Sequence, residues 1–157
     1  MDRILRRGLL GSAVAALLVS ALALAACGGS SDSEKAQMTA SIAAVSFFDN
    51  SGFHEIDDQL TQKGTLDPTA HSIAVHIQSV ALTTDWPKEL QPGAKGLAQA
   101  MGDFATAIDT DKPDLKKATE LSNKAHASWH AFSTLVWNHL QEHAGLKASS
   151  GADAHTH

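Results

Sequence analysis

Cysteine is almost absent from this chain: of its 157 residues only Cys27 is a cysteine. A single cysteine cannot form a disulfide within the chain, and it cannot supply a cysteine-based zinc or iron–sulfur site. Tyrosine is missing altogether, and no alternating apolar pattern bounded by turn residues indicates β-strands. The chain is therefore expected to be helical, and any metal chemistry in it would depend on histidine and carboxylate side chains.

An excess of positive charge is also lacking. The sequence has 12 lysines and arginines against 17 aspartates and glutamates, a net charge of −5. An acidic chain without a basic run is a poor nucleic-acid binder, so we exclude that class of partner. The motifs of several enzyme and cofactor classes are missing too: there is no phosphate loop, nucleophile elbow, Ser-His-Asp arrangement, Cys-x-x-Cys-His haem motif or Glu-x-x-His pair of the di-iron proteins.

The first 26 residues have the pattern of a secretory signal peptide. Three arginines precede an apolar run from Leu9 to Leu24, and the sequence LAAC follows. The alternative is a transmembrane anchor, but the run is short for a membrane span and ends at small residues and a glycine pair. We therefore expect the signal peptide to be cleaved.

The segment Leu24-Ala25-Ala26-Cys27 resembles the lipobox of bacterial lipoproteins. The resemblance implies cleavage before Cys27 and a lipid anchor of the palmitate kind on this residue. The protein would then be attached to the cell membrane or outer membrane, facing the periplasm or the cell surface. Removing residues 1–26 would take away three arginines and one aspartate and leave a net charge of about −7. The polar, Gly- and Ser-rich residues 27–33 are typical of a flexible tether.

Residues 34–146 are predicted to form one all-α domain, an up-down-up-down four-helix bundle. Apolar residues at steps of three and four predict helices over about 34–60, 68–84, 87–108 and 113–143. The sequence DNSG at 49–52 is a weak point that could kink or break the first helix. Residues 147–157 are expected to form a disordered, histidine-bearing tail. The clearest apolar stripe lies on the third helix: Leu90, Ala94, Leu97, Met101, Phe104 and Ile108.

Four histidines are predicted to lie in one layer of this bundle. His126 and His130 stand one helical turn apart, so their rings leave the same face of the last helix. Pairing antiparallel helices about their connecting turns places His54 and His76 at the same depth. The convergence of these four side chains indicates a metal site.

Two acids close to His54 can support such a site. Asp57 and Asp58 follow His54 by three and four residues, and either can supply an oxygen ligand or accept a hydrogen bond that fixes a histidine tautomer. Imidazole donors with a carboxylate favour zinc or copper. The pair His139 and His143 is expected to have a helix-end role instead.

The sequence therefore predicts a membrane-anchored, extracytoplasmic lipoprotein that binds zinc or copper. The alternative is a metal-free module that presents the aromatic side of the last helix, around Trp129 and Trp137, to an envelope protein. An enzyme in which Glu55 or Asp58 acts as base beside metal-bound water is the interpretation with the least support.

Overall fold

A computed structural model describes residues 31–145 of the chain. The chain divides into two units, Met1–Ser33 and Glu34–His157. The predicted signal peptide, the lipidation site Cys27, most of the predicted tether and the predicted tail lie outside the described residues. Within residues 31–145, no helix combines the length and apolar character needed to cross a membrane.

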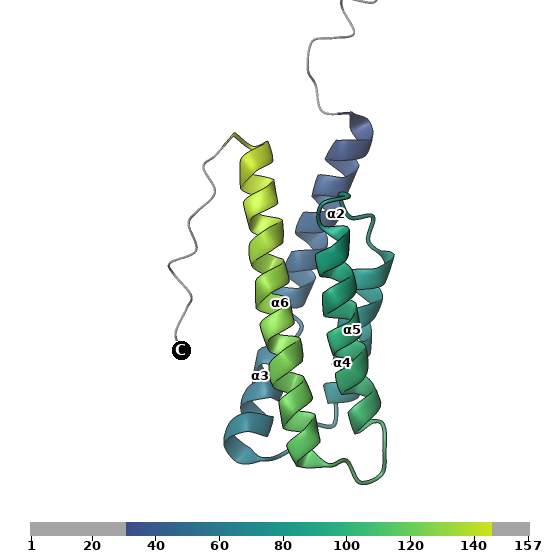
Figure 1. Cartoon of the computed structure of the whole chain (residues 1–157), viewed down its shortest axis with the longest axis vertical. Coiled ribbons are helices and arrows are strands. Elements are labelled where there is room, and N and C mark those ends of the chain that lie inside the picture. The colour runs from purple at the N-terminus through teal and green to yellow at the C-terminus, as the bar shows by residue number, and fades with distance from the viewer. Residues whose placement is uncertain (1–30, 146–157) are drawn as a thin grey trace, which may run out of the picture. The chain divides into compact units, whose positions relative to one another are not determined.

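The described part of the chain consists of helices and their connections, without a β-strand. This confirms the predicted all-α class and a helical bundle, in which the helices lie side by side (Figure 1). The elements are α2 (Asp32–Asp49), α3 (Phe53–Asp58), the π-helical turn η1 (Gln59–Lys63), α4 (Ala70–Thr83), α5 (Gln91–Ile108) and α6 (Leu115–His143).

The prediction of one helix over residues 34–60 is wrong, because the chain breaks at the weak point after Asp49. The backbone N–H of Ser51 donates to the Phe48 carbonyl at 3.2 Å, and the Ser51 hydroxyl donates to the same oxygen at 2.7 Å. Gly52 then adopts a φ of 82°, in the left-handed region that favours glycine. These contacts end α2, and α3 begins at Phe53.

The other helices begin two to four residues later than predicted. Before α4, the Asp67 carboxylate accepts from the backbone N–H of Thr69 at 2.7 Å and stabilises the turn. Asp114 is the N-cap of α6, where its carboxylate accepts from two backbone N–H groups of the first turn, at 3.0 and 3.2 Å. The last helix ends before Gly145, whose φ of 72° suits a helix stop.

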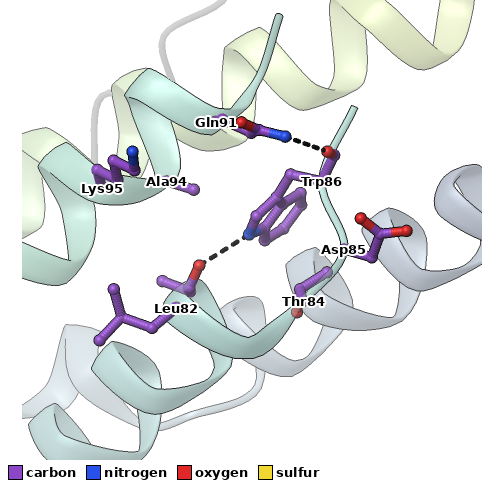
Figure 2. A pocket seen from close by; sticks show the side chains of 8 residues that line it. Leu82, Thr84, Asp85, Trp86, Gln91, Ala94 and Lys95 are labelled. Carbon is purple, nitrogen blue, oxygen red and sulfur yellow. Dashed lines mark hydrogen bonds between the residues drawn. The ribbon is translucent and has the colours of Figure 1, made fainter. Parts of the chain in front are cut away.

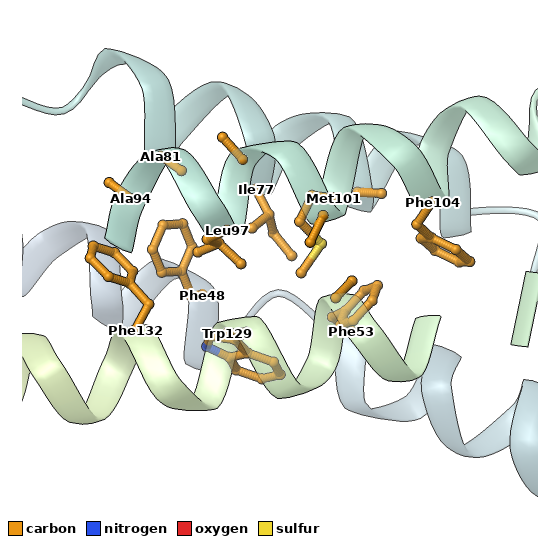
Figure 3. Packing of buried hydrophobic residues seen from close by; sticks show 14 of the residues in the cluster. Phe48, Phe53, Ile77, Ala81, Ala94, Leu97, Met101, Phe104, Trp129 and Phe132 are labelled. Carbon is orange, nitrogen blue, oxygen red and sulfur yellow. The ribbon is translucent and has the colours of Figure 1, made fainter. Parts of the chain in front are cut away.

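The core forms where α5 packs against both α4 and α6. All six members of the predicted α5 stripe are buried, which confirms that prediction. Met101 and Phe104 of this stripe face Phe53 of α3 and Trp129 of α6 (Figure 3). Burying each such side chain contributes about 1.5–3 kcal/mol relative to exposure. The core therefore reaches from α4 across α5 to the start of α3.

Trp86 ties the connection between α4 and α5 to the rest of the bundle. Its indole N–H donates to the Ala81 carbonyl at 2.8 Å, beside a pocket of about 230 Å³ (Figure 2). Its ring stacks on Phe48 of α2 and meets the edge of Phe132 of α6, with centroids 6.4 and 4.9 Å apart. Trp86 therefore joins α2 to a core whose other contacts come mainly from α4, α5 and α6.

Two glycines of α5 offer a matched test of this packing. A Cβ at Gly93 would lie 2.7 Å from the ring atom Cδ2 of buried Phe132, whereas a Cβ at Gly96 would meet nothing within 4 Å. We expect Gly93→Ala to lower the free energy of unfolding by about 1–3 kcal/mol because the ring must shift. Gly96→Ala should raise it by about 0.5–1 kcal/mol through helix propensity alone. Urea unfolding measures both values, and an equal effect of the two changes would contradict this packing.

Candidate metal centre

Three histidines from two helices bring their ring nitrogens together. Nδ1 of His54, on α3, lies 2.8 Å from Nε2 of His126 on α6. Nε2 of His130, one turn further along α6, lies 3.0 Å from the same atom. Each of the three rings offers one nitrogen, and these nitrogens all lie within 4.8 Å of one another. The three side chains, called the histidine group below, are therefore close enough to hold one metal ion.

Asp57 orients the central ring of the histidine group. Its Oδ2 lies 2.9 Å from Nδ1 of His126, and its Oδ1 accepts from the Ser122 hydroxyl at 2.7 Å. Burial raises the pKa of the Asp57 carboxyl, but the hydrogen bonds from His126 and Ser122 outweigh it and lower the pKa below its ordinary value. An ionised Asp57 keeps the His126 proton on Nδ1, so Nε2 presents its lone pair to the other two rings.

The element that carries Asp57 is itself unusual. α3 passes directly into the π-helical turn η1, and π-helical turns occur frequently at functional sites. Both α3 and η1 pack against α6, and the Thr61 hydroxyl donates to Asn123 across this contact at 3.3 Å. This contact holds Asp57 against Ser122 and His126, one helical turn apart on α6.

Trp129 forms an aromatic wall beside the histidine group. Its ring stacks on that of His130, with centroids 5.2 Å apart and planes inclined by 16°. The His54 ring lies 4.3 Å from it, centroid to centroid, and Phe53 meets it edge to face at 6.2 Å. His54 and His130 therefore each rest one ring face against a core residue, while their other sides are open to solvent.

The spacing of the three nitrogens is close to that needed by a small ion, and small shifts of the rings would complete the fit. Zinc–nitrogen bonds of about 2.0–2.1 Å place ligand atoms about 3.3 Å apart in a tetrahedral site. The two shorter separations, 2.8 and 3.0 Å, would have to widen by a few tenths of an ångström, and the third, which is within 4.8 Å, would have to approach the same value. His54 and His130 are exposed, so their rings have room for that shift. Three histidine donors would leave the fourth tetrahedral position to another group.

The structure does not bring His76 to the histidine group. This residue is exposed on α4, whose buried positions Ala70, Ala74, Ile77 and Ala81 pack in the core. Equal depth along the bundle is therefore not enough to place a residue in the group. The direction in which its side chain leaves the helix also decides whether it reaches the other ligands. Asp58, the second predicted acid, lies outside the group of potential ligands and accepts from the Gln62 side chain at 3.3 Å.

Sequence reasoning missed one contributor to this site, Ser122, whose hydroxyl donates to Asp57. Ser122 stands four residues before His126, the same spacing that joins His126 to His130, and this spacing was an available signal.

The remaining described histidines have other partners. His71 lies 3.9 Å from Asp109, Nε2 to Oδ1. Nδ1 of His143 lies 3.0 Å from the His139 carbonyl, which agrees with a helix-end role for this pair. Within residues 31–145, the histidine group is the one set of three potential ligands.

Comparison with protein-family models, with curated proteins and with solved structures gave no match to this chain. The site is therefore interpreted from its own geometry. That geometry offers three imidazole nitrogens, one tautomer fixed by a buried carboxylate, and access from solvent through His54 and His130.

The metal-free histidine group should make stability depend on pH. Partial desolvation of the rings, followed by the nearby charge of His126, lowers the pKa of both His54 and His130 below 6.5. The unfolded chain then binds these protons more readily than the folded chain, so the free energy of unfolding should fall as the pH drops below about 6.5. Urea unfolding between about pH 8 and pH 5, in the presence of a chelator, measures this fall.

The double variant His54→Gln/His130→Gln should show a shallower fall over this range. His71→Gln, which replaces a histidine outside the group, serves as the control and should keep the parent slope. An unchanged slope in the double variant would mean that the fall comes from other groups.

Proposed function

We propose that the protein binds a transition metal, zinc or copper, through His54, His126 and His130. The observation that carries the proposal is the convergence of three ring nitrogens within 4.8 Å. Neutral imidazole is a good ligand for zinc and copper(II). The Asp57 carboxylate accepts a hydrogen bond from the other ring nitrogen of His126, as is usual for metal-bound histidines. No cysteine lies among the described residues, so imidazole and carboxylate are the principal ligands available there.

We further propose that the protein acts as a lipoprotein of the bacterial envelope. The signal-like residues 1–26 and the lipobox-like sequence LAAC support an extracytoplasmic domain held on the cell membrane or outer membrane through lipid on Cys27. The bundle would have the up-down-up-down order predicted from its short connections. In this setting the protein would meet metal ions arriving from outside the cell.

Buffering or delivery of the ion suits this site better than a purely structural role. His54 and His130 are exposed, whereas His126 is partly buried beside Asp57. An ion held by one inner and two outer histidines can be reached by a competing ligand from solvent. Exchange with an envelope partner would therefore not require the bundle to open.

Removing the central histidine should abolish binding at this site. We expect the parent chain, loaded separately with zinc and copper(II) and then desalted, to retain about one ion, and His126→Ala to lose it. His76→Ala is the matched control, because it removes an exposed histidine from the neighbouring helix α4. Elemental analysis gives the stoichiometry, and a chain shortened after residue 146 removes the histidines of the tail. Equal metal content in His126→Ala and the parent would contradict the assignment.

The carboxylate behind His126 should matter for affinity without being a ligand. Asp57→Asn keeps the shape but removes the charge that holds the His126 proton on Nδ1, so we expect zinc affinity to fall about 10- to 100-fold. Asp58→Asn, one residue along the same helix, removes an equal charge from a residue that contacts Gln62 and not His126, so it should lower the affinity much less. Competition with a chromophoric chelator measures both, and equal affinities would remove Asp57 from the site.

A second candidate function is a metal-free module that docks on an envelope protein. An apolar groove of about 460 Å³ lies between α2 and α6, where Trp137 is 41% and Ile42 46% exposed. Trp129, expected beside Trp137 on this surface, is instead buried at 2% exposure. A parent chain that takes up neither zinc nor copper, and whose melting temperature a chelator leaves unchanged, would favour this function.

A further inference from the structure

A second pair of histidines lies at the end of α6, outside the histidine group. His139 and His143 stand one helical turn apart, and their ring centroids are separated by 4.2 Å. His126 and His130, the two members of the histidine group that share α6, have the same spacing and ring centroids 4.6 Å apart. The end of α6 therefore repeats the arrangement of the two histidines that this helix contributes to the candidate metal centre.

A hydrogen bond to the backbone fixes the tautomer of His143. Its Nδ1 lies 3.0 Å from the carbonyl oxygen of His139, an atom that can only accept a hydrogen bond. In the neutral ring, Nδ1 of His143 must therefore carry the proton, and Nε2 has a lone pair to offer to a metal. Metal-bound histidines usually donate their other ring nitrogen to a carbonyl or carboxylate in this way.

Both rings of the pair can be reached from solvent. His143 is exposed and His139 is half-buried, and among residues 31–145 no further hydrogen bond or ion pair engages either ring. Metal–nitrogen bonds of about 2.0–2.1 Å would place the centroids of two bound rings about 4.5–5.2 Å apart at ordinary coordination angles. The pair would therefore need to open only slightly to hold one ion.

The end of α6 is also a favourable place for a cation. The helix ends at His143, and the backbone carbonyls of its last turn give this end a partial negative charge. A bound divalent ion is attracted to that charge, as a protonated histidine would be. Glu142, which is exposed and precedes His143, adds a formal negative charge. A helix-end role and metal binding therefore have the same electrostatic basis, and only a binding measurement separates them.

We propose that His139 and His143 form a second, weaker metal site, which binds late first-row divalent ions and copper(II) most tightly. Imidazole is a good ligand for these ions, and their affinity for such a site rises along the series to copper(II). Two protein donors leave the other coordination positions to water, so the ion should exchange readily and be lost on desalting. The inference does not depend on the proposed function, because the pair and the histidine group share no ligand.

Equilibrium dialysis of the chain against copper(II) tests the second site. His155→Gln/His157→Gln is the background for every variant, so that the histidines of the tail do not contribute. We expect about two ions per chain at saturation, one bound tightly and one weakly, and His139→Gln/His143→Gln should lose the weaker ion. His71→Gln is the control, since it removes an exposed histidine of α4, and it should keep both ions.

A change of spacing provides a stricter control. Asn138→His/His139→Gln keeps the number of histidines but separates the two rings by five residues, so that they leave the helix in different directions. This variant and the single variant His143→Gln should both bind the weaker ion about 10-fold or more less tightly, because one ligand can no longer assist the other. Circular dichroism checks that each variant is folded. Broadening of NMR signals near residues 139–143 by copper(II) locates the ion.

The outcomes separate the two sites. If His139→Gln/His143→Gln still binds two ions, or if the change of spacing leaves the affinity unchanged, the pair is not a metal site. If the double variant has a lower melting temperature but the same copper(II) uptake as its parent, the pair has a helix-end role alone. His126→Ala should lose the tighter ion and keep the weaker one. A parent that binds the weaker ion alone would contradict the proposed function and support this inference.

Discussion

The turn at residues 50–52 is the constraint on which the candidate site depends. Gly52 adopts a left-handed backbone conformation that other residues rarely take, and the Ser51 hydroxyl closes the turn against Phe48. Because of this turn, α3 is a separate helix and not a continuation of α2. The buried side chain of Phe53 anchors α3 in the core, and His54 and Asp57 both contact His126 on α6.

His126 is the residue through which the parts of the site interact. One of its ring nitrogens is committed to the buried carboxylate of Asp57, and the other is approached by both His54 and His130. Partial burial, followed by the nearby charge of His126, lowers the pKa of His54 and of His130, so protonation of these two outer rings is disfavoured. A divalent cation at the proposed site would be attracted to the lone pairs of all three rings, which lie close enough together to hold one ion.

Trp129 contacts both the hydrophobic core and the candidate site. Trp129 packs against Phe53, which in turn meets Phe104 of α5, and its other contacts are with the rings of His54 and His130. An ion bound at the histidine group would therefore strengthen the same contacts that hold α3 and α6 together. Binding to the folded chain alone stabilises it by mass action, so metal content and thermal stability should change together.

Local periodicity in the sequence determined the helical class, the buried stripe of α5 and the shared face of His126 and His130. These features follow from 3.6 residues per turn and need no knowledge of the neighbours. Only the tertiary structure decided that His76 stays outside the group and that Asp57 rather than Asp58 supports His126. The reason is that each depends on the direction in which a helix presents a side chain. That direction is set by packing against α5 and α6 and by the turn at Gly52, whose contacts join residues from separate helices.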